Sequence, residues 1–142
     1  MAQVTQIFNS DTTLNKEFSL YLSSVHAGFP SAADDYLDRK IDLNEHLIKH
    51  PAATFFVKVK GDSMIGAGIY SGDMLIVDRS EDSKNNSIVV AILNGEFTVK
   101  RLQKTENKIF LIAENPSYKS IEITAGMDFE VWGVVLHSIR SF

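Results

Sequence analysis

Ser63 is the first residue of this chain whose type and setting could do chemistry. It lies in Gly61-Asp62-Ser63-Met64, directly after a strand-like run, so a turn could present its hydroxyl. Backbone N–H groups of such a turn can stabilise an oxyanion, a contribution of roughly 3–4 kcal/mol per donor in a well-studied case. Gly-Asp-Ser is also common in ordinary turns, so this segment alone favours a structural turn over a nucleophile.

A nucleophilic serine needs a base, and histidine is the usual one. The four histidines are His26, His46, His50 and His137. No pattern pairs any of them with a carboxylate, so each is better explained as a surface or helix-end residue. His46 and His50 are spaced for one helix face but come with no third metal ligand at a suitable spacing. We therefore expect neither a metal site nor a cofactor.

Lys100 is the other candidate base. Alternation along Glu96–Leu102 places Thr98 and Lys100 on one strand face and Phe97 and Val99 on the other. The ordinary interpretation is a solvent-facing lysine. To act as a base near neutral pH, its pKa must fall about three units from about 10.4, at a cost of about 4 kcal/mol. Burial under an apolar cover can lower a lysine pKa that far.

The elements that must position these residues are mostly strands. Runs rich in β-branched and aromatic residues predict Thr54–Lys60, Met74–Val77, Ile88–Leu93, Phe97–Leu102, Ile109–Ala113 and Phe129–Ile139. Asn94-Gly95 predicts a type I′ hairpin between two of them. One helix precedes the strands, with Asp42 as its N-cap and Pro51 ending it after His50. The expected fold class is mostly β, a compact rolled or barrel-like domain with one short N-terminal helix.

Length and composition limit the function classes. The chain has 142 residues, of which 44% are hydrophobic and 23% charged, enough for one domain with a core. The net charge of −4, with scattered basic residues, argues against direct nucleic-acid binding. Without cysteine there is no disulfide and no thiolate. No segment approaches the roughly 20 apolar residues that span a bilayer, so we expect a cytoplasmic protein without membrane association.

The first forty residues differ from the rest. We interpret 1–40 as an extended N-terminal arm and 41–142 as a β-rich catalytic and dimerisation domain. The arm is polar, with one apolar cluster that could dock it: Phe18, Leu20, Tyr21 and Leu22. Small residues then gather between Ala27 and Ala33. An ordinary disordered terminus is the alternative interpretation.

Three motifs occur in order along the chain, and their order and spacing are more specific than any one of them. They are Gly61-Asp62-Ser63-Met64, Gly72-Asp73-Met74-Leu75-Ile76-Val77-Asp78 and Gly95-Glu96-Phe97-Thr98-Val99-Lys100, with Ala27-Gly28 upstream. Together they closely resemble the LexA/UmuD family of self-cleaving Ser–Lys proteins. The likeness runs from about residue 27 to the C-terminus.

The resemblance implies a role for each matched residue. Ser63 corresponds to the nucleophile, Lys100 to the general base and Ala27–Gly28 to the scissile bond. The family's oxyanion hole would fall at the backbone N–H groups of Asp62 and Ser63. The resemblance to UmuD-like members implies Cys before the scissile Gly, whereas this chain has Ala27, as LexA-type repressors do. The side chain at the bond stays small, so cleavage is still expected.

The resemblance also implies a biological setting. UmuD-like members form homodimers and self-cleave when stimulated by the RecA–single-stranded-DNA filament. The shortened form then joins a UmuC-type Y-family polymerase in error-prone translesion synthesis during the SOS response.

Three rival functions remain. Membrane signal peptidases also use Ser and Lys, but they need a membrane anchor. A LexA-like repressor needs a DNA-binding domain ahead of the scissile bond, and the 27 residues before it, with Lys16 as their one basic side chain, are too few. The third rival is a non-catalytic polymerase-binding subunit with a vestigial Ser63–Lys100 pair.

Overall fold

The computed structural model describes residues 2–12, 17–21 and 37–142. It divides into two compact units, which we describe separately: residues 1–10 together with 50–142, and residues 11–49. Ala27 and Gly28, the residues of the expected scissile bond, lie outside the described residues, as does His26.

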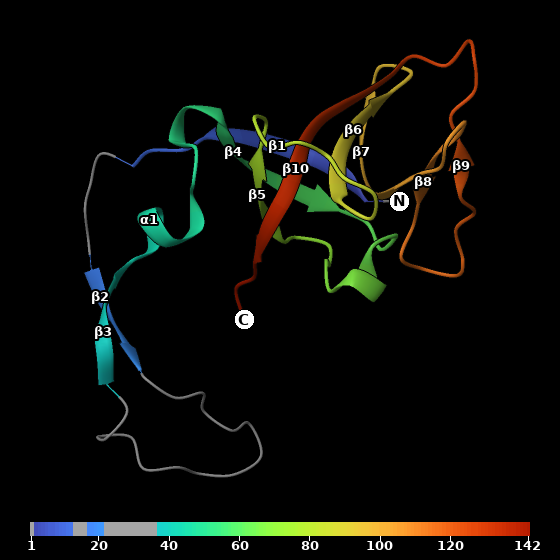
Figure 1. Cartoon of the computed structure of the whole chain (residues 1–142). Coiled ribbons are helices and arrows are strands. Elements are labelled where there is room, and N and C mark those ends of the chain that lie inside the picture. Colours follow the sequence, from blue (N-terminus) through green and yellow to red (C-terminus); the bar gives the residue numbers. More distant parts are fainter. Residues whose placement is uncertain (1, 13–16, 22–36) are drawn as a thin grey trace. The chain divides into compact units, whose positions relative to one another are not determined.

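The larger unit is built on one antiparallel sheet of eight strands, in the order β1-β4-β5-β10-β6-β7-β8-β9. The strands are β1 Gln3–Asn9, β4 Thr54–Lys60, β5 Met74–Asp78, β6 Ile88–Leu93, β7 Glu96–Lys104, β8 Ile109–Ile112, β9 Ile121–Glu122 and β10 Phe129–Ile139. Two short 3-10 helices, η2 Pro51–Ala53 and η3 Ile65–Ala67, flank β4. The long strand β10 runs between β5 and β6 (Figure 1).

The sheet curls into a half-barrel and encloses its core. Register shifts in β10 near Gly133 and His137 help it bend, as bulges do. The curl brings the start of β1 against β7, where the Val99 N–H donates to the Ala2 carbonyl over 3.2 Å. Buried side chains from β4, β5, β6 and β7, including Val57, fill the inside. The predicted mostly β, barrel-like fold class is therefore confirmed.

The local predictions agree with the sheet. Strands β4, β6 and β10 have the bounds predicted from sequence, and β5, β7 and β8 differ from theirs by only one or two residues. Asn94 and Gly95 have φ values of 49° and 81°, the two positive angles that a type I′ hairpin requires. Strands β1 and β9 were not predicted.

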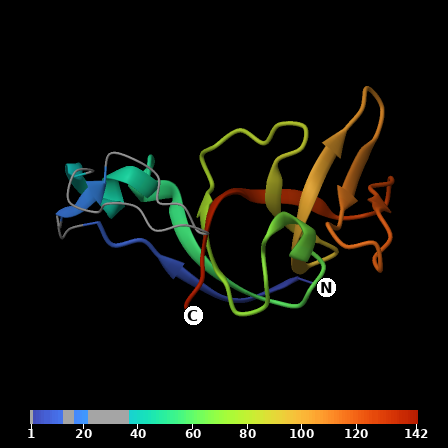
Figure 2. The ribbon, with the colours of Figure 1, turned by 90° about the horizontal axis from the view of Figure 1, so that it is seen from below.

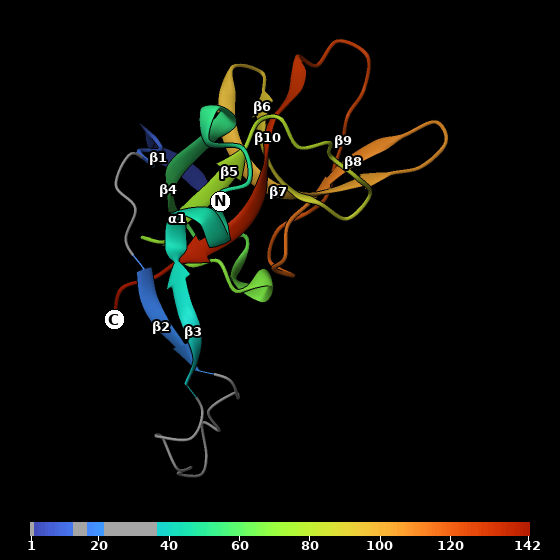
Figure 3. The same cartoon turned by 60° about the vertical axis from the view of Figure 1, so that its left-hand side comes forward.

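The smaller unit pairs β2 (Glu17–Tyr21) with β3 (Leu37–Asp42), which leads into helix α1 (Leu43–Leu47) (Figure 3). Asp42 is the predicted N-cap, since its Oδ1 accepts from the Asn44 N–H over 2.9 Å. The helix ends before His50, where the sequence placed its end, because Ile48 is already extended, with φ −116° and ψ 105°. None of the helices among the described residues has the length and hydropathy of a membrane-spanning segment.

Candidate active site

Ser63 lies in the turn that follows β4. The chain leaves the strand through Gly61, whose φ of 103° is in the region that glycine adopts most easily. Helix η3 begins two residues after Ser63, so the serine is held between a strand end and a helical turn. Its exposed fraction is 0%, which is unusual for a turn serine and places the hydroxyl inside the protein.

A loop near residue 115 braces this turn. The Asn115 side chain donates to the Asp62 carbonyl over 3.0 Å, and the Tyr118 hydroxyl donates to the Asp62 carboxylate. The Gly66 N–H donates to the Glu114 carbonyl over 2.7 Å. A Cβ on Gly66 would lie 2.5 Å from that carbonyl oxygen, so only glycine fits there. Nothing in the sequence indicated that this loop holds the serine turn.

Lys100 on β7 meets Ser63 inside the half-barrel. The lysine is 2% exposed, and its Nζ lies 3.1 Å from Ser63 Oγ. Two further hydrogen bonds orient the amine, to Thr98 Oγ1 over 3.0 Å and to the Val99 carbonyl over 3.1 Å. The ordinary interpretation of Lys100 as a solvent-facing strand residue is wrong, because both faces of β7 are buried at this point.

Burial changes the chemistry of this lysine. Desolvation lowers the pKa of Lys100 from 10.5 to about 8. All three groups that accept hydrogen bonds from its Nζ are uncharged. With a pKa of about 8, about one molecule in ten carries the neutral amine at pH 7. A neutral lysine within hydrogen-bond reach of a serine hydroxyl can accept its proton.

Ala2 also contacts Ser63, and nothing in the sequence singled it out. The Ala2 N–H donates to Ser63 Oγ over 2.7 Å. The Ala2 carbonyl accepts from the Val99 N–H and, at 3.5 Å, from the Thr98 hydroxyl. Ala2 is 1% exposed, so the start of β1 covers the dyad. Strand β1 begins beside the end of β4, with Gln3 opposite Lys60, and runs antiparallel to β4 away from that end (Figure 2, blue beside green).

His50 has a partner that the sequence did not suggest. Its Nδ1 lies 2.6 Å from Asp78 Oδ2. His50 is exposed near the end of α1, as expected, and only the fold brings this carboxylate to it. The reason is topological, because β4 and β5 pair Thr54 with Asp78 and so bring the end of β5 beside η2. His46 is exposed on α1, and His137 is half-buried on β10.

The His50–Asp78 pair and Glu81 form the one described group of side chains with the spacing of a metal site, with ligand atoms within 4.8 Å of one another. Protein groups already use the Asp78 oxygens, since Oδ1 accepts from the Ser80 N–H, the Ser80 hydroxyl and the Glu81 N–H. Burial opposes the charged form of Asp78, but the bonds from His50 and Ser80 outweigh it and lower the pKa of that carboxyl. We interpret this group as a structural contact that joins the end of β5 to the segment before η2.

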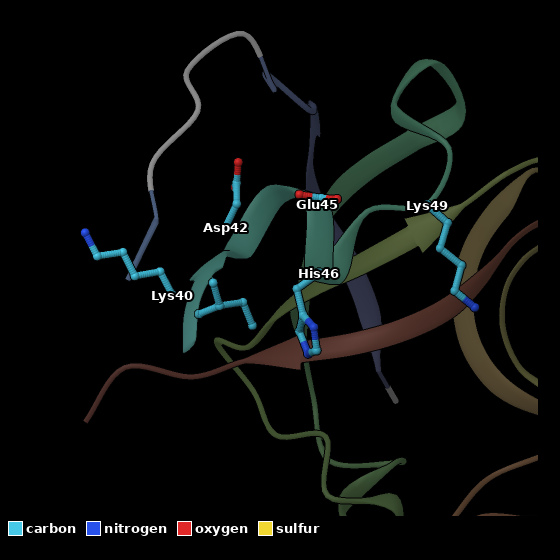
Figure 4. A pocket seen from close by; sticks show the side chains of 6 residues that line it. Lys40, Asp42, Glu45, His46 and Lys49 are labelled. Carbon is cyan, nitrogen blue, oxygen red and sulfur yellow. The ribbon is translucent and has the colours of Figure 1, made fainter. Parts of the chain in front are cut away.

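A pocket of about 360 Å³ lies in the smaller unit (Figure 4). It is lined by Lys40, Ile41, Asp42, Glu45, His46 and Lys49. The charges are mixed and the lysines lie at its two ends, so no group of one sign gathers there. The pocket includes neither Ser63 nor Lys100 and adds nothing to the dyad.

Comparison with known proteins relates this chain to one family. The sequence profile described as Peptidase S24-like matches residues 19–136. Protein SamA of Salmonella typhimurium is 43% identical over 125 residues, which cover 86% of each chain. Protein MucA of Escherichia coli is 42% identical over 120 residues, 84% of this chain and 82% of MucA. LexA repressor 1 of Xanthomonas campestris is 41% identical over 119 residues, 84% of this chain and 59% of the repressor.

Proposed function

We propose a function from an established premise: the chain belongs to the Peptidase S24-like family. The protein is an autocatalytic serine peptidase, with Ser63 as nucleophile and Lys100 as general base. The observation that carries this proposal is the distance of 3.1 Å between Lys100 Nζ and Ser63 Oγ. It gains weight from the burial of both residues and from the lowered lysine pKa, because a base must first lose its own proton.

The proposed substrate is the chain's own Ala27–Gly28 peptide bond. Neutral Lys100 takes the proton of Ser63 Oγ while that oxygen bonds to the Ala27 carbonyl carbon. The bond to the Gly28 nitrogen then breaks, and Lys100 returns the proton to the departing amine. Water, deprotonated by the same lysine, hydrolyses the Ala27–Ser63 ester and restores the serine. Because nucleophile and substrate share a chain, attack costs little translational entropy.

The backbone N–H groups of Asp62 and Ser63 are proposed as the oxyanion hole. Supporting this, the 115–118 loop fixes Asp62 through both its carbonyl and its carboxylate. A donor held in place before the reaction needs no reorganisation as charge develops on the oxygen. The small side chain of Ala27, followed by glycine, leaves room for the serine to reach the carbonyl carbon.

The biological setting is proposed from the motif resemblance to UmuD-like proteins, together with the match to most of the length of SamA and MucA. The protein is a cytoplasmic homodimer whose cleavage is stimulated by the RecA–single-stranded-DNA filament. The filament raises the population in which the scissile bond reaches Ser63. The shortened form then serves as a subunit of a UmuC-type translesion polymerase in SOS mutagenesis and does not bind nucleic acid directly.

Self-cleavage is tested by incubating the purified full chain near pH 10 and measuring the fragment masses. We expect one break, after Ala27, in the unsubstituted chain and none in Ser63→Ala or Lys100→Ala. Cutting that persists in either variant would refute the dyad. If the unsubstituted chain stays intact both at alkaline pH and with the filament present, the non-catalytic polymerase-binding subunit becomes the better account.

A further inference from the structure

The main chain of Ala2 is held in the Ser63 site as an extended substrate would be. Strand β1 pairs antiparallel with β4, from Gln3 opposite Lys60 to Asn9 opposite Phe55. On the other side, the β7 residue Val99 donates its N–H to the Ala2 carbonyl. Backbone pairing on both sides, with a buried small side chain between, is how a groove recognises an added strand. The groove between β4 and β7 is therefore a strand-binding site that the chain's own start fills.

The contact at the nucleophile also blocks the chemistry. Ser63 Oγ accepts hydrogen bonds from the Ala2 N–H and from Lys100 Nζ. Ser63 is 0% exposed with Ala2 in place, so the carbonyl of a second peptide segment cannot reach the hydroxyl. Any substrate that is to meet Ser63 must first displace Ala2.

Strand β1 is built so that it can leave. It lies at the edge of the sheet and has a single β-strand partner along most of its length. Beyond Ala2 only Val4 is half-buried, and the remaining β1 residues are exposed, including Ile7 at 39% and Phe8 at 44%. An edge strand with few buried side chains opens at a lower free energy than the core strands do. Its removal leaves the dyad itself in place, because Lys100 and Ser63 belong to β7 and the β4 turn.

We propose that residues 2–9 are an autoinhibitory strand that competes with the cleavable segment for the groove at Ser63. The inference rests on the proposed self-cleavage and specifies how it is regulated. The uncut protein is slow because β1 occupies the groove, and an activator acts by favouring the state in which β1 has left. Cleavage then proceeds at a rate proportional to the fraction of molecules with an open groove.

The first experiment compares two tryptophan substitutions in the full chain. Ala2→Trp places an indole where a buried methyl lies, so it should eject the start of β1. Gln6→Trp is the matched control, because Gln6 is exposed on the same strand. We expect Ala2→Trp to self-cleave at least about tenfold faster at pH 8, corresponding to a groove filled in nine molecules of ten or more, and Gln6→Trp at the unsubstituted rate. Equal rates in all three chains would overturn the proposal.

A reversible lock tests the same point from the opposite side. Gln3 and Lys60 are cross-strand partners with exposed side chains, and the chain has no other cysteine to interfere. Paired strand positions lie within disulfide range, so Gln3→Cys/Lys60→Cys should form a bond that holds β1 beside Ser63. We expect the oxidised form to stay uncut and the reduced form to cut at the unsubstituted rate. Undiminished cutting while the bond is closed would contradict the proposal.

A binding measurement separates this proposal from the proposed function. A labelled synthetic peptide of residues 20–34 is titrated into Ser63→Ala chains that also carry Ala2→Trp or Gln6→Trp. We expect at least about tenfold tighter binding to the Ala2→Trp chain. Equal affinities would refute competition even if the chain self-cleaves. If the peptide binds more tightly to the Ala2→Trp chain but no chain with Ser63 self-cleaves, the strand-binding groove stands and the proposed peptidase function is refuted.

Discussion

Two of the buried ionisable side chains in the half-barrel, Asp73 and Lys100, have opposite surroundings. Asp73, between β4 and β5, is 1% exposed and meets Arg140, whose Nε and Nη2 lie 2.7 Å from its two carboxylate oxygens. Lys100 is 2% exposed and hydrogen-bonds to uncharged groups, Ser63 among them. Asp73 is therefore paired with an opposite charge, whereas Lys100 has only uncharged partners.

The pKa shifts of the two groups follow from this difference. The hydrogen bond from Arg140 holds the pKa of the Asp73 carboxyl below its usual value, which favours the charged form. Desolvation lowers the pKa of Lys100 to about 8, which favours the neutral form. A buried charge with a partner stays charged and loses stability when the partner is removed, whereas a buried amine without one reduces stability and can act as a base. We therefore interpret the Asp73 site as structural and the Lys100 site as catalytic. Substitutions at Arg140 and at Lys100 test the two halves of this comparison.

The largest effect should come from breaking the paired site. Arg140→Ala leaves the Asp73 carboxylate buried with only the Tyr70 N–H and the Ser138 hydroxyl as donors. We expect the free energy of unfolding at pH 7 to fall by more than any other substitution described below changes it, measured by urea denaturation in the uncut Ser63→Ala background. The native stabilisation is complete above the unfolded pKa of Asp73, near 3.9, and is lost as pH falls through the lower folded pKa.

The variant should therefore lose less stability on acidification than the chain with Arg140. Lys108, whose Nζ lies 3.4 Å from Glu122 and which is well exposed, provides the matched control. Lys108→Ala should change stability by less than about 1 kcal/mol. A comparable loss of stability in both variants would mean that burial does not determine how much the Asp73–Arg140 pair contributes to the free energy of unfolding.

Much of this contrast could not be read from the sequence. Local pattern was enough for β4, β6, β10 and the Asn94-Gly95 hairpin, since each depends on residues close in the chain. Alternation placed Thr98 and Lys100 on the same face but could not show that this face is covered. The cover comes from curling of the sheet and from β1, whose partner β4 lies far along the chain. The motif resemblance, rather than periodicity, brought Ser63 and Lys100 together.

The second prediction removes the unpaired charge. At pH 7 Lys100 is protonated in both the folded and the unfolded chain, and only the folded chain bears the desolvation cost. Lys100→Met should therefore stabilise the Ser63→Ala chain at pH 7 by about 2 kcal/mol. The pKa difference sets an upper limit of about 3 kcal/mol, and the lost hydrogen bonds of the amine reduce the gain. Thermal and urea unfolding measure the gain.

The pH dependence sharpens the same test. Between about pH 8 and 10.4 the unfolded chain retains a proton that the folded chain has lost, so the chain with Lys100 gains stability as pH rises. Lys100→Met removes this gain, and the stabilities of the two chains should converge near pH 10. A difference between them that stays constant with pH would show that the lysine pKa is not lowered in the folded protein.

The third prediction concerns the rate of self-cleavage. With a Lys100 pKa of about 8, the neutral fraction rises from about a tenth at pH 7 to nearly all near pH 10. The rate should therefore rise about tenfold over that range and level off above about pH 9. Quantifying the cut fragment against time at each pH gives the profile. A rate that keeps rising through pH 10 and beyond would assign the titration to an ordinary exposed lysine.

The smallest effect should come from Thr98, a positioning residue for the amine. Its hydroxyl oxygen accepts from Lys100 Nζ over 3.0 Å, and a bond of this kind stabilises the ammonium form more than the neutral amine. Thr98→Val keeps the shape and removes the acceptor, so the midpoint of the pH–rate profile should fall by about half a unit, with a plateau lowered no more than about threefold. Thr98→Ser should restore both. A purely structural role would lower the plateau without moving the midpoint, and a midpoint that rises would mean that the hydroxyl favours the neutral amine.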